Sequence, residues 1–175
     1  MLLVGGASRR FGSPKALAEL EGRSLAERAW RTLSEVCDEQ FAVGKAGELD
    51  LRFEIVDDAS EVRAPLAGVV AGLRAARNER VAFLPVDTPL VSADDLRALA
   101  DGGGDAAVPQ TGPLPGAYSR AALDLLERRL RAGKLSLREA LDELDTRTVE
   151  LARERLLNVN TPADLERARR IAGRA

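Results

Sequence analysis

The chain has 175 residues, 45% of them hydrophobic, a length typical of a single domain, so we expect residues 1–175 to form one. Its 26 basic and 28 acidic side chains nearly balance, which argues against a nucleic-acid or membrane-binding surface and makes any anion binding local. The absence of histidine excludes histidine-ligated zinc and Ser-His-Asp catalysis, leaving carboxylates, lysine, arginine, backbone amides and hard metals.

The cysteine content and the first residues suggest a compartment. The single cysteine, Cys37, cannot form an internal disulfide, which fits a reducing environment. The first apolar run is four residues long, too short for a signal peptide or a membrane-spanning helix. We therefore expect a cytoplasmic protein.

The chain opens with an apolar run that ends in two glycines and continues into a basic loop. The residues concerned are Gly5, Gly6, Arg9, Arg10 and Lys15. Paired glycines let a ligand approach the backbone, successive amides can form an anion-binding concavity, and the basic side chains can neutralise a polyphosphate. The spacing matches neither a P-loop nor a dinucleotide fingerprint. It predicts a strand followed by a nucleotide-binding loop, the alternative being an ordinary glycine turn with solvated charges.

Strand and helix patterns alternate up to about residue 100. Capping motifs at Ser24 and Ser92 each predict the start of a helix. Helical spacing also covers 66–73, and short strands are predicted at 40–43, 53–56 and 81–84. This alternation predicts an α/β fold with a mostly parallel central sheet and helices on both faces.

Beyond residue 101 the alternation is less regular. We expect a strand at 106–108, a loop at 110–116 and a helix through Leu123, Leu126 and Leu130. A capping box at 136–139, a strand at 147–151 and a final helix capped by Thr161-Pro162-Ala-Asp164 follow.

Asp87 follows the apolar strand 81–84 directly. Ligands of open α/β sheets bind beyond the carboxyl ends of the strands. Mg²⁺ takes one or two carboxylates together with phosphate oxygens and water. We therefore predict Asp87 to be a magnesium ligand, the alternative being an aspartate that merely caps a turn.

Four stretches together resemble a known family. Residues 3–15, Leu-Val-Gly-Gly-Ala-Ser-Arg-Arg-Phe-Gly-Ser-Pro-Lys, are similar to the signature of nucleotidyltransferases that act on molybdopterin, especially the MobA-like molybdenum cofactor guanylyltransferases. Pro65–Gly68, Leu84–Pro89 and Asn158–Pro162 resemble three further motifs of that family, in the same order. The resemblance implies a three-layer Rossmann-like fold and transfer of GMP from GTP to the phosphate of molybdopterin. It also implies Mg²⁺ as cofactor and transient contact with molybdenum cofactor synthesis or acceptor proteins.

The resemblance also assigns roles to individual residues. It places Arg9, Lys15 and Asp87 in catalysis, with Asp87 as the metal ligand. It implies nucleotide contacts for Leu3, Val4, Gly5, Gly6, Lys15, Asp58, Gly68 and Asp87. Asn158 and Asn160 would serve the acceptor side or the metal, and an extended backbone there would turn both amides the same way. Tyr118 and Arg120 follow a loop rich in proline that resembles the acceptor side of the family's site.

Three of these positions also have a purely structural interpretation. Asp58, after Asp57, could be a solvated strand end, Gly68 a helix-packing glycine, and Asn160 only part of the cap of the last helix.

Two departures from the family pattern leave more than one nucleotide possible as the substrate. Val43 is followed by Gly44 where the family commonly has a nucleotide-contacting asparagine, and Ala64 stands where glycine usually precedes the Pro65 motif. The Gly5-Gly6 pair is more similar to guanylyltransferases than to their CTP-using relatives. The alternatives are a cytidylyltransferase acting on molybdopterin or a sugar or alcohol phosphate, and a non-catalytic nucleotide-binding protein.

Overall fold

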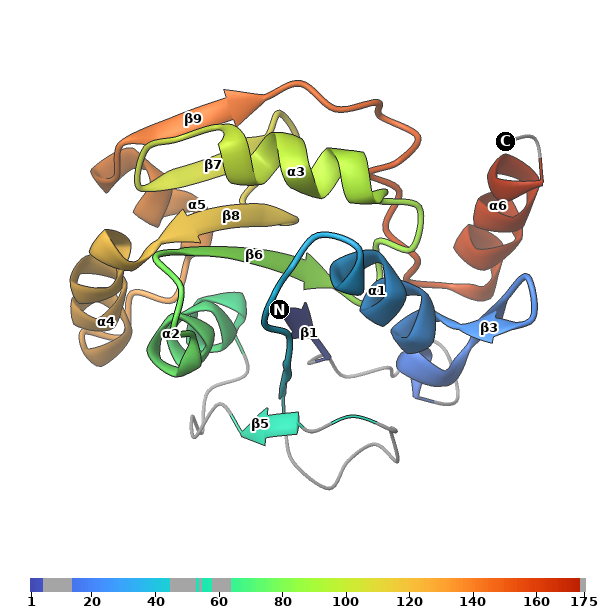
Figure 1. Cartoon of the computed structure of the whole chain (residues 1–175), viewed down its shortest axis with the longest axis horizontal. Helices are drawn as coiled ribbons and strands as arrows, with labels where there is room; N and C mark the ends of the chain where they lie inside the picture. The colour runs from blue at the N-terminus through green and yellow to red at the C-terminus, as the bar shows by residue number, and fades with distance from the viewer. Residues whose placement is uncertain (5–13, 45–52, 54, 58–63, 174–175) are drawn as a thin grey trace.

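A computed structural model describes residues 1–4, 14–44, 53, 55–57 and 64–173 (Figure 1). The strands are β1 (Leu2–Leu3), β2 (Glu19–Leu20), β3 (Arg23–Ser24), β4 (Ala42–Gly44), β5 (Ile55–Asp57), β6 (Arg80–Pro85), β7 (Ala106–Pro109), β8 (Gly116–Ser119) and β9 (Thr146–Val149). The α-helices are α1 (Leu25–Ser34), α2 (Pro65–Ala75), α3 (Ala93–Asp101), α4 (Leu123–Arg131), α5 (Leu137–Ala140) and α6 (Pro162–Ala172). Within these residues, no helix is long and apolar enough to cross a membrane.

Seven of the described strands form one sheet in the order β5-β4-β1-β6-β8-β7-β9. All neighbours pair in parallel except β8, which is antiparallel to both β6 and β7. Leu3 at the end of β1 pairs with Pro85 at the end of β6. The chain segments that leave these two central strands therefore start from the same edge of the sheet.

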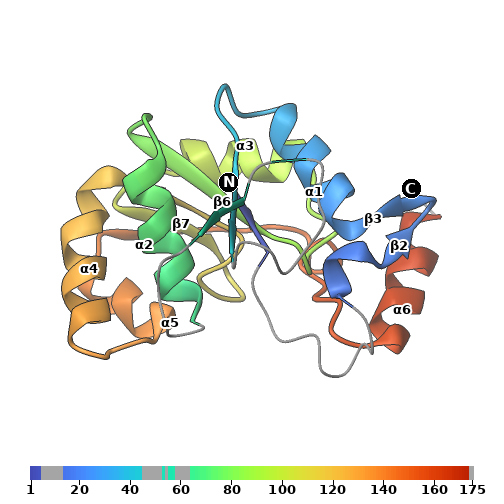
Figure 2. The same cartoon turned by 90° about the horizontal axis from the view of Figure 1, so that it is seen from below.

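Helices cover both faces of the sheet, as the sequence predicted (Figure 2). Buried side chains of α1, α3 and α6 share one core cluster, and those of α2, α4 and α5 share the other. The fold is thus the expected three-layer α/β arrangement with a mostly parallel sheet.

The helix starts follow the capping signals. Ser24, Ser92 and Thr161 each accept a hydrogen bond from the backbone three residues on, and each box is completed by the carboxylate at that position. α1 turns Leu25, Ala26, Ala29 and Leu33 into the core. α5 begins after Ser136, whose side chain accepts from Glu139 N–H.

Two features of the fold were not predicted from the sequence, and some predicted strand boundaries differ from the observed ones. The hairpin of β2 and β3 has strands of two residues each, too short for a periodic pattern to reveal. β8 was also missed, because it directly follows a loop rich in glycine and proline. The strand predicted at 147–151 is β9, which ends two residues earlier.

Candidate functional site

Three segments far apart in the sequence meet at one point. The ammonium Nζ of Lys15 lies 2.8 Å from Oδ2 of Asp87 and 3.0 Å from Oδ1 of Asn160. Lys15 is separated from these partners by 72 and 145 positions. Three of the four motif stretches thus contribute a side chain to the same site.

A turn at the end of β6 positions Asp87. Val86 N–H donates to the carbonyl of Leu3 at 3.1 Å, which continues the pairing of β1 and β6. The backbone N–H and the hydroxyl of Thr88 then both donate to the carbonyl of Pro85, at 3.1 and 2.9 Å. Because Thr88 closes the turn, the carboxylate of Asp87 is left to face Lys15.

Lys15 opens a short 3-10 turn, Lys15–Leu17, on the other side of the site. Its carbonyl accepts from Ala18 N–H at 3.0 Å, which fixes its backbone. The side chain of Lys15 is 14% exposed and that of Asp87 26% exposed. Partial burial strengthens the attraction between them relative to a pair on the open surface.

Asn160 reaches the site from the segment that precedes α6. Val159 is fully buried, and its N–H donates to the backbone carbonyl of Asp87 at 2.7 Å. Asn158 and Asn160 on either side are exposed, which agrees with the predicted alternation. The side-chain oxygen of Asn160 accepts from Lys15, so Asn160 does more than cap the last helix, whereas Thr161 is the cap.

The predicted nucleotide-binding residues Leu3, Val4 and Gly68 lie around the ends of β1 and α2. Val4 N–H donates to the carbonyl of Val43 at 3.0 Å, so the chain stays in the sheet plane just past β1. A Cβ on Gly68 would lie 3.1 Å from Cδ2 of Leu3, so Gly68 packs closely on β1, in line with a packing role. Gly5, Gly6, Arg9, Arg10 and Asp58 lie outside the described residues.

Tyr118 and Arg120 do not join the site. Tyr118 is fully buried, its hydroxyl donates to the carbonyl of Pro113 at 2.7 Å, and burial raises its pKa. Ser119 pairs with Arg80, the first residue of β6, and the guanidinium of Arg120 donates to the carbonyl of Ala76. β8 runs antiparallel to β6 and carries Arg120 to the opposite end of β6 from Asp87.

The donor set of the site suits a hard cation. The carboxylate of Asp87 and the amide oxygen of Asn160 approach a common point, at present occupied by the Lys15 ammonium. Oxygen ligands of this kind suit Mg²⁺, which needs few protein ligands when phosphates and waters supply the rest. Among the described residues, no group of three or more His, Cys, Asp or Glu could hold a metal without such help.

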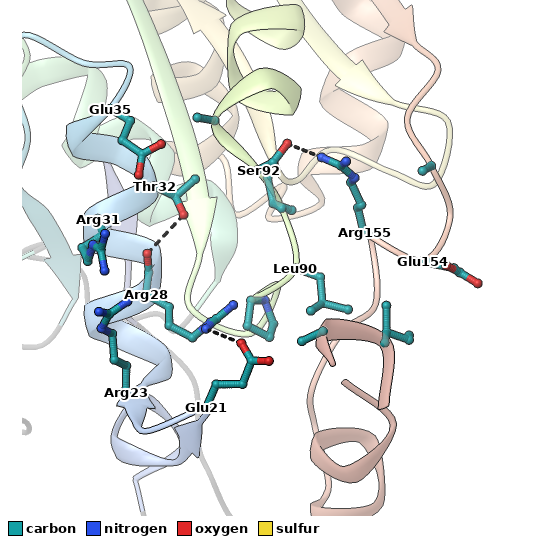
Figure 3. Close-up of a pocket in the computed structure, with 16 residues that line it drawn as sticks. Glu21, Arg23, Arg28, Arg31, Thr32, Glu35, Leu90, Ser92, Glu154 and Arg155 are labelled. Carbon is teal, nitrogen blue, oxygen red and sulfur yellow. Dashed lines mark hydrogen bonds and ion pairs between the residues drawn. The ribbon is translucent and has the colours of Figure 1, made fainter. Parts of the chain in front are cut away.

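A hollow of about 680 Å³ lies beside α1, and Lys15, Asp87 and Asn160 are not among the residues that line it. The loop 89–93, which begins two residues after Asp87, forms one wall. Four arginines line it, Arg23, Arg28, Arg31 and Arg155 (Figure 3). Arg28 lies 3.2 Å from Glu21, and Arg155 is hydrogen-bonded to Ser92. Arg155 also lies 3.1 Å from Asp95. The charges of these two arginines are therefore largely compensated within the protein.

Comparison with known proteins agrees with this geometry. The sequence model of the family described as "MobA-like NTP transferase domain" matches residues 1–148. A molybdenum cofactor guanylyltransferase from Desulfosudis oleivorans is 31% identical, over 96% of this chain and 92% of that protein.

Solved structures agree as well. The molybdopterin-guanine dinucleotide biosynthesis protein A from Archaeoglobus fulgidus superimposes with a TM-score of 0.79 at 27% identity, over 99% of this chain and 98% of that one. A nucleotidyl transferase from Methanothermobacter superimposes with a TM-score of 0.80 at 25% identity, over 99% and 96% of the two chains. The chain therefore belongs to the MobA-like NTP transferase family and is a nucleotidyltransferase.

Proposed function

We propose that this nucleotidyltransferase transfers GMP from GTP to the phosphate of molybdopterin, with release of pyrophosphate, in molybdenum cofactor biosynthesis. The observation that carries the proposal is the convergence of Lys15, Asp87 and Asn160, from three separate motifs, on one point at the carboxyl edge of the sheet. The names of the relatives supply the substrate pair: the Desulfosudis oleivorans protein is called a guanylyltransferase of the molybdenum cofactor.

The proposed reaction needs no imidazole. A phosphate oxygen of the acceptor forms a bond to the α-phosphorus of GTP, and the bond from that phosphorus to the bridging oxygen breaks. Pyrophosphate leaves with the electron pair. The acceptor phosphate is already ionised near neutral pH, so no general base has to remove a proton, which is consistent with a chain that lacks histidine.

The chain's own residues would act by position and charge. Lys15 would donate to the α- or β-phosphate, and Arg9 would hold the departing pyrophosphate. The backbone from Leu3 to Gly6, with Asp58 and Gly68, would contact the nucleotide. Asn158 and Asn160 would face the acceptor or the metal.

Asp87 and Asn160 would hold Mg²⁺ in this proposal. The ion would offset the charge that develops on the phosphate oxygens. Lys15 must then move its ammonium from Asp87 toward the nucleotide phosphates, a shift that its long, flexible side chain allows. Binding of the metal and of the nucleotide should therefore depend on each other.

Calorimetric titration with GTP and with CTP, each with and without magnesium, tests the proposal, followed by pyrophosphate release with molybdopterin. We expect magnesium-dependent binding that favours GTP, and turnover once the acceptor is added. A preference for CTP would overturn the guanylyl assignment in favour of a cytidylyltransferase. Binding without turnover would indicate a nucleotide-binding protein, and binding of neither nucleotide would mean that the departures at Gly44 and Ala64 abolish the site.

A further inference from the structure

We infer that Asp164 is a positioning residue, which sets where the side-chain oxygen of Asn160 lies and acts on the reaction only through Asn160. The inference rests on the proposed function of the site formed by Lys15, Asp87 and Asn160. Asp164 itself does not touch Lys15 or Asp87 in any described contact; its hydrogen bonds go to Asn160 and Thr161.

The carboxylate of Asp164 binds one more backbone group than the cap of α6 requires. Its Oδ2 accepts from Thr161 N–H at 2.8 Å and from the Thr161 hydroxyl at 2.8 Å, which is the ordinary work of a capping box. The same oxygen also accepts from Asn160 N–H at 3.0 Å. This additional bond holds the residue before the cap, which is the residue that contacts Lys15.

The capping box of α3 provides a comparison within the same protein. There Oδ2 of Asp95 accepts from the N–H and hydroxyl of Ser92, at 2.9 and 2.8 Å. The residue before that cap, Val91, donates its N–H to the carbonyl of Thr88 instead. A helix start of this kind therefore forms without the extra bond, so the bond from Asn160 is not a by-product of capping.

Asn160 is held on both sides. On one side, the neighbouring Val159 is buried and its N–H donates to the carbonyl of Asp87 at 2.7 Å. On the other, Asp164 holds the N–H groups of Asn160 and Thr161. Because the side chain of Asn160 is exposed, its oxygen is positioned by these backbone anchors together with the hydrogen bond from Lys15.

The anchor is itself fixed to the core. Leu165 and Ala168 of α6 are buried and hold the helix against the core. The hydroxyl of Thr161 and then the N–H of Asn160 hold the pKa of Asp164 below its ordinary value, so the carboxylate is charged at neutral pH and accepts all three bonds.

The test compares Asp164→Ala with Arg169→Ala, which loosens the same helix without touching its cap. In Asp164→Ala we expect kcat to fall about tenfold, the low end of the effect of removing a residue that orients a ligand. In Arg169→Ala, kcat should stay within about twofold after correction for the folded fraction.

A double-mutant cycle separates positioning from mere stability. If Asp164 acts only through Asn160, the double variant Asp164→Ala/Asn160→Ala has the same kcat as Asn160→Ala alone. A further drop of about tenfold in the double variant would show an independent role and overturn the inference.

A readout that needs no catalysis keeps this inference separate from the proposed function. Hydrogen exchange of the Asn160 amide, followed by NMR, should accelerate about tenfold or more in Asp164→Ala and stay unchanged in Arg169→Ala. Unchanged exchange in Asp164→Ala would overturn the positioning role. Accelerated exchange in a protein whose wild type binds no nucleotide would instead contradict the proposed function alone.

Discussion

At the scale of single residues, the site consists of one cation held by two oxygens. Lys15 donates to the carboxylate of Asp87 and to the amide oxygen of Asn160, and it is largely shielded from solvent. In the proposed reaction, a nucleotide phosphate would replace the carboxylate as the partner of Lys15, so charge and donor would remain matched.

Loss of Lys15 or Asp87 should therefore reduce turnover far more than it reduces folding. We expect Lys15→Ala and Asp87→Ala each to lower kcat by about two orders of magnitude or more, as the loss of a preorganised charge-stabilising group does. Steady-state pyrophosphate release measures this. Lys134→Ala and Asp94→Asn, at exposed positions, are the matched controls and should retain wild-type turnover. Near-normal turnover in either site variant would contradict the assignment.

The sequence predicted these three side chains but not the way they are held. Lys15, Asp87 and Asn160 stand in motifs that can be recognised along the chain. The bond from Asn160 N–H to Asp164 spans only four residues, but a capping box predicts contacts with Thr161 alone. The distance of Arg120 from Asp87 was unpredictable for a related reason, since the direction of β8 is decided by its pairing with β6.

At the scale of elements, local signals located helices better than strands. Capping boxes at Ser24, Ser92 and Thr161 identify three helix starts. Strands of two to four residues have too few alternations to define their ends, and long-range pairing sets those instead. Long-range packing also decides which residues α2 needs, because glycine is required in this helix only where it contacts the sheet.

Gly72 is where α2 lies closest to the sheet. A Cβ there would lie 2.6 Å from Cε1 of the fully buried Phe83 and would also collide with the side chain of Met1. We expect Gly72→Ala to destabilise the fold: overpacking costs about 1–3 kcal/mol, and the better helix propensity of alanine offsets up to about 1 kcal/mol. Urea unfolding measures the difference.

Gly173→Ala is the matched control for that experiment. Its added Cβ would meet only the carbonyl oxygen of Arg169, at an ordinary 3.4 Å. The change in unfolding free energy should stay within about 0.5 kcal/mol. Equal stability of the two variants would contradict the close approach of α2 to β6.

At the scale of the whole molecule, two carboxylates with lowered pKa values help to hold helices in place. Glu127 of α4 accepts from Arg74 of α2 at 2.6 Å and also pairs with Arg131, and the hydrogen bond from Arg74 is the main reason that its pKa lies below its ordinary value of 4.5. The hydroxyl of Thr161 contributes most to lowering the pKa of Asp164 from 3.8. One residue ties α2 to α4, and the other holds the start of α6.

These two groups should shape the acid limb of the stability profile. A carboxyl whose pKa is lower in the folded state contributes stability that is fully present above its unfolded pKa and is lost as the pH falls through the folded one. We therefore expect the unfolding free energy of the wild type to fall as the pH drops below the ordinary values of 4.5 and 3.8. Glu127→Gln/Asp164→Asn should be less stable at pH 7 and should lose less on acidification, as measured by urea unfolding from pH 7 downward. Each single variant should show part of the effect, because the two sites lie on different helices, α4 and α6, and should act independently. An acid limb as steep in the double variant as in the wild type would mean that other carboxylates control acid unfolding.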